Sequence, residues 1–346
     1  MPRPARRVTI RDVAEATGLS QAAVSYAMRG LQVSEETQER VRRAAAELGY
    51  EANPVARALA SGRTGMVGVL WASLEDLWQQ ETVVALGAAL LGDDRFAIVL
   101  DSGGDPGHEE RLARRLVDQR VDAMVLAPVD PAAPFWAELA EQVPLVVVGD
   151  ALAGARTAGE VVFDNRNGVT LALEHLVALG HRHIGVLTPT RPSTPDRPGD
   201  VHVRAEAERL GVRVTIGTAA HALGAATDAA LGLLSAPGRP TALFCFSDSI
   251  AHGGYAAARA LGLDVPRDLS VLGYDGRPVS ALLTPPLTTV DWDTAAIVTA
   301  TSRLVTAALE GVPRRRRVVR RPTLLEGGST APPPRRTARS HGAGGR

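Results

Sequence analysis

The stretch from residue 8 to residue 64 constrains this chain most, because it holds several short helix patterns in a segment too small for a catalytic domain. The first two patterns are joined by TGLS at residues 17–20, and a short turn with a glycine connects the helices of a helix-turn-helix. Apolar residues at helical spacing supply a small shared core. We therefore predict an all-α helix-turn-helix headpiece over residues 1–52, and with it sequence-specific binding of double-stranded DNA.

Capping residues mark where these helices begin. Thr9 precedes the first helix pattern and Ser20 precedes the second, which we expect over residues 21–28. A serine or threonine at that position accepts a hydrogen bond from a free amide of the first turn. Val24 and Met28 are four residues apart, so we expect both on the buried face of the second helix.

The second helix of a helix-turn-helix enters the major groove, with its N-terminal residues near base edges. Gln21, Ala22 and Tyr26 project outward in the predicted helix, and we expect them to read bases. Glutamine pairs with adenine, and an alanine or an aromatic edge contacts a thymine methyl. The alternative is an unrelated three-helix bundle whose polar residues are merely solvated. The other positions that we expect to bind DNA are Thr9, Ser20, Ser25 and Arg29.

The hydrophobicity pattern of the sequence changes at Gly65, where apolar runs begin to alternate with amphipathic helix patterns. Such alternation is typical of βαβ units, in which parallel strands are covered by helices on both faces. About 260 residues with this many strands fit two open, doubly wound parallel-sheet subdomains better than one. The runs are MVGVLW, FAIVLD, AMVLAP, LVVVGD, HIGVLT, RVTIG, ALFCF and SVLGYD.

Shorter segments separate and follow these parts. Residues 53–64 form a short helix pattern, with Asn53 as its cap and Pro54 at its first position, followed by a Gly-containing link. We assign residues 65–330 to the α/β core. Residues 331–346 are basic and of low complexity, and we expect them to be a disordered tail. The run of arginines from Arg314 to Arg317 favours the start of a solvated edge strand over a DNA contact.

Composition excludes several kinds of enzyme. All 38 basic residues are arginine, which rules out a Schiff-base lysine, a P-loop lysine and a Ser-x-x-Lys nucleophile. No serine stands in a Gly-x-Ser-x-Gly elbow, and His181 and His183 lack further ligands at a spacing that suits a metal. We therefore expect no enzyme activity, no cofactor and no metal site.

The distribution of charge, the cysteine content and the absence of targeting segments bear on the partners of the chain and on its location in the cell. The net charge is zero, yet residues 1–64 carry ten arginines against seven acids and residues 314–346 carry ten against one, which suits contact with phosphate at the ends. The chain has one cysteine, Cys245, in an apolar run that predicts a buried strand. No export signal and no membrane-spanning segment is evident, so we expect a cytoplasmic protein.

Many short motifs resemble the LacI/GalR family of bacterial transcriptional regulators, in the family's order and over about nine-tenths of the chain. In the headpiece they are TIRDVAEATGLSQAAVS at 9–25, VSEETQERV at 33–41 and NPVARALA at 53–60. In the core they are RVDAMVL at 120–126, DNRNG at 164–168, HLVALGHRHIG at 175–185, SDSIAHG at 247–253, LGLDVPRDLSVLGYD at 261–275, PLTTV at 286–290 and GST at 328–330.

The resemblance implies roles for residues beyond the headpiece. Residues 53–60 would be a hinge helix that orders on the operator, with Leu59 as a wedge in the minor groove and Arg57 near phosphate. The alternative is a plain linker helix with Leu59 packed on the core. The core would resemble a periplasmic binding protein, with an effector in the cleft between its subdomains, where strand ends meet. The implied effector-binding residues are Asp150, Arg197, Ser247, Asp248 and Asp275.

Some of these positions depart from the family pattern. Ser247 replaces a common asparagine and Gly276 a common aspartate, and in the Pro-rich segment after HIGVLT the arginine is Arg191, Arg197 or Arg204. For each single residue a capping or turn role remains the alternative. Carboxylates at strand ends suit a hydroxyl-rich ligand, so we expect a sugar.

Taken together, the residues and the resemblance predict a homodimeric regulator, a repressor, that binds operator DNA under the control of a small-molecule effector. A regulator sensing a nucleobase, a nucleoside or a phosphorylated metabolite is the alternative within the same class. A solute-binding protein would require an export signal and no helix-turn-helix. An enzyme of the doubly wound α/β class would require a nucleophile, metal or cofactor motif.

Overall fold

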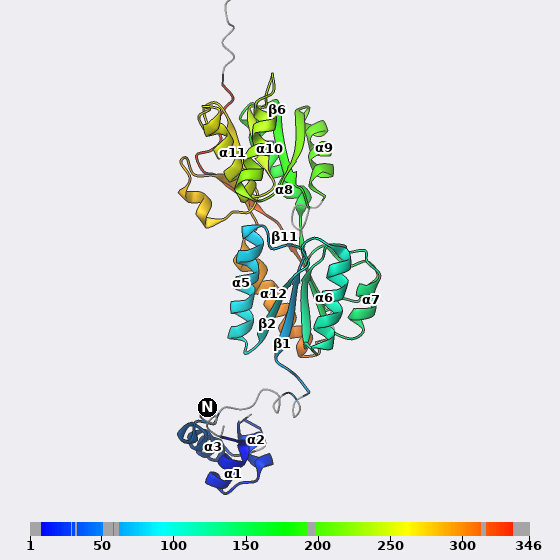
Figure 1. Ribbon diagram of the computed structural model, residues 1–346, viewed down its shortest axis with the longest axis vertical. Helices are drawn as coiled ribbons and strands as arrows, with labels where there is room; N and C mark the ends of the chain where they lie inside the picture. The colour runs from blue at the N-terminus through cyan, green and yellow to red at the C-terminus, as the bar shows by residue number, and fades with distance from the viewer. Residues whose placement is uncertain are drawn as a thin grey trace, which may run out of the picture. The chain divides into compact units, whose positions relative to one another are not determined.

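The computed structural model describes residues 8–28, 30–31, 33–50, 58, 62–191, 198–312 and 316–334. The chain divides into two compact units, Met1–Gly65 and Met66–Arg346 (Figure 1). Most of the segment expected to form the hinge helix lies outside the described residues, as do most of the basic tail and five of the expected site residues. These five are Arg29, Asn53, Arg57, Leu59 and Arg197.

The first unit is the expected helical headpiece. Its helices are α1 (Ile10–Thr17), α2 (Gln21–Met28) and α3 (Glu35–Leu48). The backbone amide of Thr9 donates to the Asp12 carboxylate at 2.7 Å, which fixes the start of α1. Gly18 ends α1 with φ at 66°, a left-handed conformation that glycine adopts without a steric penalty. The chain can therefore turn sharply into α2, as the sequence predicts.

One apolar cluster joins the three helices of the headpiece. It consists of Val13, Ala14, Val24, Ala27, Val41 and Ala45. Val24 is buried as expected, but the prediction for Met28 is wrong, because Ala27 is fully buried and Met28 is exposed. Residues three apart face the same side of a helix as well as residues four apart. The small alanine at the shorter spacing lets α2 approach its neighbours closely.

The second unit contains two six-stranded sheets among its described residues, which confirms the predicted pair of doubly wound parallel-sheet subdomains. Sheet A has the order β11-β5-β4-β3-β1-β2 and is parallel throughout. Its strands are β1 (Met66–Trp71), β2 (Phe96–Asp101), β3 (Ala123–Ala127), β4 (Leu145–Gly149), β5 (Gly159–Phe163) and β11 (Arg316–Arg320).

Sheet B has the order β12-β10-β9-β8-β6-β7, and only the short edge strand β12 pairs antiparallel, with β10. Cys245 lies buried in β8, as predicted. The strands of this sheet are β6 (His183–Pro189), β7 (Arg213–Ala219), β8 (Ala242–Cys245), β9 (Ser270–Gly273), β10 (Thr288–Asp291) and β12 (Thr323–Leu325).

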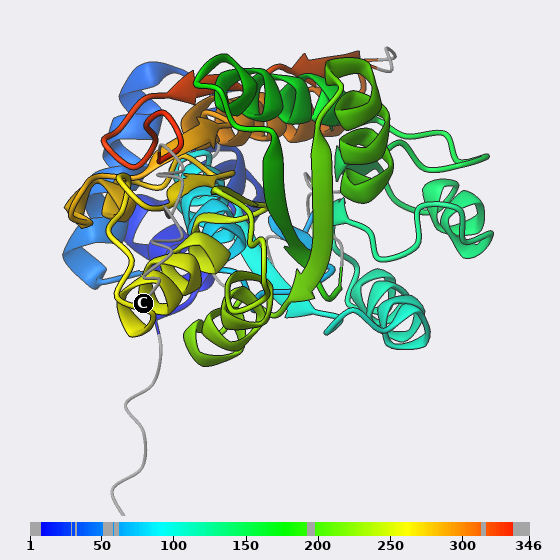
Figure 2. The same cartoon turned by 90° about the horizontal axis from the view of Figure 1, so that it is seen from above.

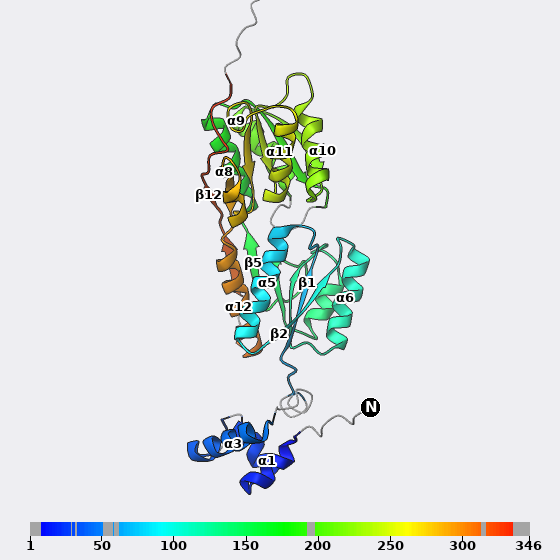
Figure 3. The same ribbon diagram turned by 60° about the vertical axis from the view of Figure 1, so that its left-hand side comes forward.

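Helices cover both faces of each sheet. Around sheet A, α5 and α12 lie together on one face while α6 and α7 lie on the other (Figures 1 and 3). Around sheet B, α8 and α9 cover one face and α10 and α11 the opposite one (Figure 2). The helices are α5 (Leu77–Gly92), α6 (Pro106–Asp118), α7 (Phe135–Ala140), α8 (Asn165–Ala178), α9 (Gly199–Leu210), α10 (Leu223–Leu234), α11 (Asp248–Ala260), α12 (Thr294–Leu309) and the 3-10 turn η1 (Pro278–Leu282).

The described chain passes between the two subdomains three times, at residues 163–165, 291–294 and 320–323. One buried cluster of aromatic rings lies along two of these crossovers. The Phe163 ring packs edge-on against Trp78 of α5 and against Trp292, at centroid distances of 6.1 and 5.0 Å. Trp292 in turn contacts Tyr274 of the sheet B subdomain, at 5.6 Å. The crossovers are therefore packed into the core rather than exposed as loops.

The described chain beyond residue 330 packs on sheet B. The backbone amide of Ala331 donates to Ser270 Oγ at 3.0 Å, and its carbonyl oxygen lies 3.0 Å from His181 Nε2. The expected edge strand near the arginine run is confirmed as β11, which lies at the edge of sheet A and itself includes Arg316 and Arg317.

Candidate functional site

The second helix of the headpiece presents one polar face. Gln21, Ala22 and Tyr26 are exposed on α2, while Val24 and Ala27 on the opposite side are fully buried. Ser20 Oγ accepts a hydrogen bond from the Ala23 amide at 3.2 Å and so caps the helix, as its position predicts. Ser25 is half-buried, and Thr9 is exposed at the start of α1. The three expected base readers are thus all exposed on α2, with Gln21 and Ala22 in its first turn and Tyr26 one turn further along.

A cleft opens between the two subdomains of the second unit, at the carboxyl ends of their strands. It contains an outer cavity of about 1070 Å³ and an inner cavity of about 210 Å³, and both are lined from the two subdomains. Ser73 and Arg191 line both cavities. This is the place where doubly wound folds bind ligands, because loops with free backbone groups converge there.

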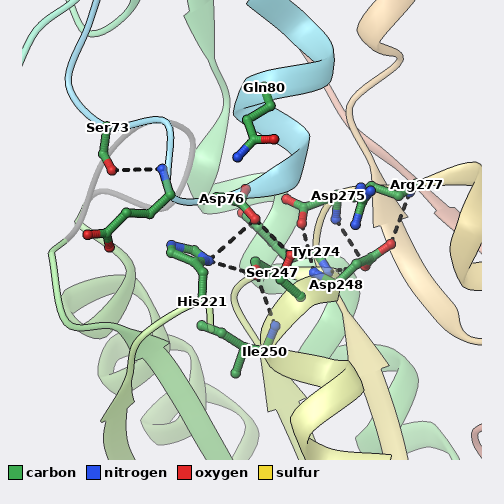
Figure 4. A network of polar contacts seen from close by, with 12 residues as sticks. Ser73, Asp76, Gln80, His221, Ser247, Asp248, Ile250, Tyr274, Asp275 and Arg277 are labelled. Carbon is green, nitrogen blue, oxygen red and sulfur yellow. Dashed lines mark hydrogen bonds and ion pairs between the residues drawn. The ribbon is translucent and has the colours of Figure 1, made fainter. Parts of the chain in front are cut away.

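Asp76 directly precedes α5, and its side chain reaches from the sheet A subdomain to the sheet B subdomain. Its Oδ1 accepts a hydrogen bond from Ser249 Oγ at 2.9 Å and lies 3.4 Å from His221 Nδ1 (Figure 4). His221 also lies 3.1 Å from Ser247 Oγ. Asp76 and His221 line the inner cavity. The floor of the cleft is therefore a network of polar groups held by both subdomains.

Asp248 lies beneath this floor and is fully buried at the start of α11. Its Oδ1 accepts hydrogen bonds from the amides of Tyr274 and Asp275 and from Thr289 Oγ1, at 3.1, 3.4 and 2.6 Å. Its Oδ2 accepts from the Arg277 amide at 3.0 Å and from Ser280 Oγ at 2.7 Å. The carboxylate therefore joins the start of α11 to the loop after β9 and to β10, which positions Asp275.

Asp275 is also buried, and one of its oxygens accepts a hydrogen bond from the Asp248 amide at 2.7 Å (Figure 4). Burial, followed by the negative charges of Asp76 and Asp248, raises the pKa of the Asp275 carboxyl well above its ordinary value. Ser247 caps α11 by accepting from the Ile250 amide at 3.1 Å. The predicted ends of β8 and β9 thus bring Ser247, Asp248 and Asp275 together.

Arg277 forms an ion pair between the subdomains. Its guanidinium donates to Glu81 on α5 through Nη2 at 2.7 Å and Nε at 3.3 Å, a two-point contact with one carboxylate. The Arg277 side chain is 6% exposed, whereas that of Glu81 is 47% exposed. The Nη1 atom of Arg277 is buried without a hydrogen-bond partner in the structure.

The arginine candidates differ in where they lie. Arg191 stands two residues after β6 and lines both cavities, and Arg204 on α9 lines the outer cavity. Arg197 lies outside the described residues. Asp150 follows β4 at the carboxyl end of sheet A, but it does not line either of these two cavities.

Sequence reasoning missed Asp76, Glu81, His221 and Arg277. Two signals pointed to members of this group. Asp76 stands just before a helix and shortly after a strand, and Arg277 stands two residues after the GYD motif. Among the described residues, no group of three or more His, Cys, Asp or Glu side chains is arranged to hold a metal ion. In the same part of the chain, no helix has the length and apolar character needed to cross a bilayer.

Two family models match the chain. Residues 9–53 match bacterial regulatory proteins of the lacI family, and residues 173–330 match the periplasmic binding protein-like domain. Among solved structures, the lac repressor dimer bound to operator and the anti-inducer ONPF is 25% identical, with a TM-score of 0.81 over 94% of this chain and 100% of that one. A complex of the transcriptional regulator CelR with cellobiose is 25% identical, with a TM-score of 0.67 over 93% of this chain and 100% of that one.

Curated proteins agree with this match. The ribose operon repressor of Haemophilus influenzae is 31% identical over 82% of this chain and 86% of its own length. The HTH-type transcriptional regulator MalR of Streptomyces coelicolor is 32% identical over 88% of this chain and 91% of its own length. With a headpiece, two parallel-sheet subdomains and relatives at this identity and coverage, the chain belongs to the lacI family of bacterial regulatory proteins.

Proposed function

We propose that this chain is a cytoplasmic, homodimeric repressor whose affinity for operator DNA is set by a sugar bound between the subdomains of its core. The observation that carries the proposal is the cleft, because its cavities are lined from both subdomains and are continuous with the polar network around Asp76. A ligand that fills such a cleft contacts both subdomains at once. It therefore has a direct means of changing their relative orientation.

At the DNA-binding end of the chain, Gln21, Ala22 and Tyr26 read base edges, since all three side chains are exposed on α2. Thr9, Ser20, Ser25 and Arg29 position the headpiece on the phosphates. Leu59 acts as the minor-groove wedge of a hinge helix over residues 53–60, in which Asn53 caps the start and Arg57 contacts the backbone. A single half-site contact is small, so tight binding requires both headpieces of a dimer.

An exposed apolar surface supports the dimer. On α5 and β2 the side chains of Val84 and Phe96 are 72% and 58% exposed, beside a groove of about 540 Å³. On the sheet B subdomain, Leu282 is 82% exposed at the rim of a groove of about 1090 Å³ between α11, η1 and the start of α10. Exposed apolar side chains beside a groove are typical of interaction surfaces. The similar lac repressor structure is itself a dimer, and a second copy of this chain is the natural occupant.

For the effector, buried carboxylates beside the cleft favour a ligand that donates hydrogen bonds. A carboxyl group accepts hydrogen bonds from hydroxyl groups when it is ionised, and it also donates one when it is protonated, the form that the raised pKa of Asp275 favours. Asp275 and Ser247 are proposed contacts, Asp150 contributes from the end of β4, and Asp248 acts by holding the loop that carries Asp275. One of Arg191, Arg197 and Arg204 supplies a guanidinium group that contacts the effector in the cleft. The relatives named after ribose and cellobiose are consistent with a sugar.

The ligand acts by population shift. It changes the balance between two orientations of the subdomains only by the difference between its affinities for them. That change alters the separation of the two hinge helices in the dimer, and hence the stability of both headpieces on the operator.

The proposal is tested in two steps. First, the full-length protein is used to select operators from a random DNA pool, and its binding is measured by fluorescence anisotropy. Second, thermal-shift measurements with sugars, nucleosides and phosphorylated sugars identify ligands that also change operator affinity. Stabilisation by nucleobases or phosphorylated compounds alone would overturn the assignment to a sugar. No selected operator at all would overturn the assignment to a DNA-binding repressor.

The hinge is tested on the operator found in this way. Leu59→Ala should weaken binding about tenfold or more, because it removes the side chain that opens a base step and so costs ~1.4 kcal/mol or more. Ala60→Ser, a small change at the next position, is the control and should have little effect. Equal effects of the two substitutions would show that Leu59 is no wedge.

A further inference from the structure

The cleft between the subdomains is divided into two unequal compartments. The inner compartment, of about 210 Å³, is lined by Ser73, Glu75, Asp76, Gln79, Thr190, Arg191, Ala220 and His221. The outer compartment, of about 1070 Å³, shares Ser73 and Arg191 and continues over Asp130, Thr188, Asp200 and Thr218. Cavities that hold a small organic ligand measure about 300–1,000 Å³. The inner compartment is smaller than this range, and the outer one slightly exceeds it.

Arg191 forms the boundary between the compartments. Its side chain leaves the end of β6 and crosses to the sheet A subdomain, where Nη1 donates to the Gly103 carbonyl oxygen at 2.9 Å. The stem of the side chain lies on Gly104, where an added Cβ would come within 3.1 Å of Arg191 Cδ. Nη1 also lies 3.8 Å from Glu75. Arg191 is therefore attached to the sheet A subdomain through the Gly103 carbonyl oxygen, and its side chain, which is 62% exposed, lines both cavities.

Both compartments are lined by polar as well as apolar groups, and the polar groups differ between them. The inner one is bounded by the Asp76 carboxylate and the His221 ring, which are held against each other and against Ser249 and Ser247 (Figure 4). These groups are already held in place before a ligand binds, so binding requires little further ordering of side chains and its entropic cost is lower. The outer one combines two carboxylates, Asp130 and Asp200, with hydroxyls of threonines and the cation of Arg204. Donors and acceptors in both compartments suit hydroxyl groups.

We infer that the effector consists of two linked sugar units, a disaccharide or an equivalent glycoside, with one ring in the inner compartment and the second in the outer compartment. This inference rests on the proposed function, since it takes the cleft to be the sugar site. Arg191 lies at the level of the glycosidic linkage and contacts both rings. A monosaccharide occupies the inner compartment and leaves the outer one to water, so it forgoes the hydrogen bonds of the second ring.

The test is isothermal titration of the full-length protein with disaccharides and with the monosaccharides of which they are made: maltose, cellobiose, lactose and melibiose against glucose and galactose. At least one disaccharide should bind about tenfold tighter or more than each of its components, the factor expected from one or two further hydrogen bonds. A monosaccharide that binds as tightly as every disaccharide containing it would overturn the inference and leave the sugar repressor of the proposed function intact.

Substitutions in each compartment test which of the two sugar rings it binds. Thr218→Val and Asp200→Asn, both in the outer compartment, should weaken the disaccharide about tenfold while the affinity for its monosaccharide stays unchanged. His221→Ala in the inner compartment should weaken both ligands. Asp228→Asn, on the exposed side of α10, is the control and should change neither.

The results that would contradict the disaccharide inference differ from those that would contradict the proposed sugar effector. Equal losses for both ligands from Thr218→Val and Asp200→Asn would contradict the division into compartments. Binding of nucleosides or phosphorylated compounds, with no sugar of either size bound, would instead overturn the proposed sugar effector, and the inference with it.

Discussion

Replacing Asp248 by asparagine should destabilise the core, because this carboxylate accepts five hydrogen bonds from the protein itself. Asparagine keeps the shape but offers only one acceptor oxygen. Whichever way the amide turns, its NH2 group faces at least one backbone amide, that of Arg277 or those of Tyr274 and Asp275. Either orientation of the amide leaves at least one buried N–H donor unsatisfied, at a cost of ~1–3 kcal/mol, and the negative charge of the acceptor is lost as well.

The expected loss is therefore about 2–4 kcal/mol of unfolding free energy, a large part of the 5–15 kcal/mol that is typical of a folded protein. With a urea slope of ~3 kcal/mol/M, the unfolding midpoint should fall by about 1 M. Tryptophan fluorescence reports this transition for the core alone, since Trp71, Trp78, Trp136 and Trp292 all lie in the second unit and are buried.

Asp228→Asn on the exposed side of α10 is the matched control and should shift the midpoint little, because exposed substitutions seldom change stability by more than ~0.5 kcal/mol. If Asp248→Asn unfolded at the same urea concentration as the control, the carboxylate would not hold the loop that carries Asp275. The role assigned to Asp248 would then return to direct contact with the effector.

Three further results are expected. Gly168→Ala should cost ~1–3 kcal/mol of stability in urea unfolding, because its Cβ would overlap the buried Tyr274 hydroxyl and lie 2.9 Å from Cζ, whereas Gly232→Ala, with open space around it, should gain ~0.5–1 kcal/mol. Burial lowers the pKa of His181, so its neutral form is favoured in the folded state; stability should decline as the pH falls below ~6.5, and His181→Gln should flatten that decline in melting curves. Burial raises the pKa of the Cys245 thiol, so iodoacetamide at pH 8 should label it only after denaturation; rapid labelling of the native protein would contradict its burial.

The sequence predicted strands well where apolar runs were continuous, as in β1, β3 and β4, which are buried on both faces. It did not predict β5, β10 or β12. The strand β5 begins with Gly159-Glu160, and β10 begins with two threonines, so their patterns resemble loops. Both become strands because they fill positions inside a sheet, next to β4 and β9 respectively. Tertiary pairing outweighed the local pattern there.

The candidate site shows the same limit. Ser247, Asp248 and Asp275 were found through the family resemblance, and they lie together because the neighbouring parallel strands β8 and β9 end at one edge of sheet B. Asp76 and Glu81 are separated from their partners Ser249 and Arg277 by 173 and 196 positions, and they meet only because two separate sheets face each other. No spacing in the sequence encodes that approach. Asp248 shows the converse, since its motif indicated a ligand contact while its surroundings occupy both oxygens.

The two kinds of contact between the subdomains differ in how they respond to rotation. The rings of Trp78, Phe163, Trp292 and Tyr274 are packed at the crossovers, where the chain itself limits displacement. The ion pair of Arg277 with Glu81 and the bond from Ser249 to Asp76 join groups that no crossover holds together, so rotation about the crossovers stretches them first. Asp76 also lines the inner compartment. A ligand that binds there competes for, or strengthens, a contact on which the orientation of the subdomains depends, and this gives it the differential affinity that a switch requires.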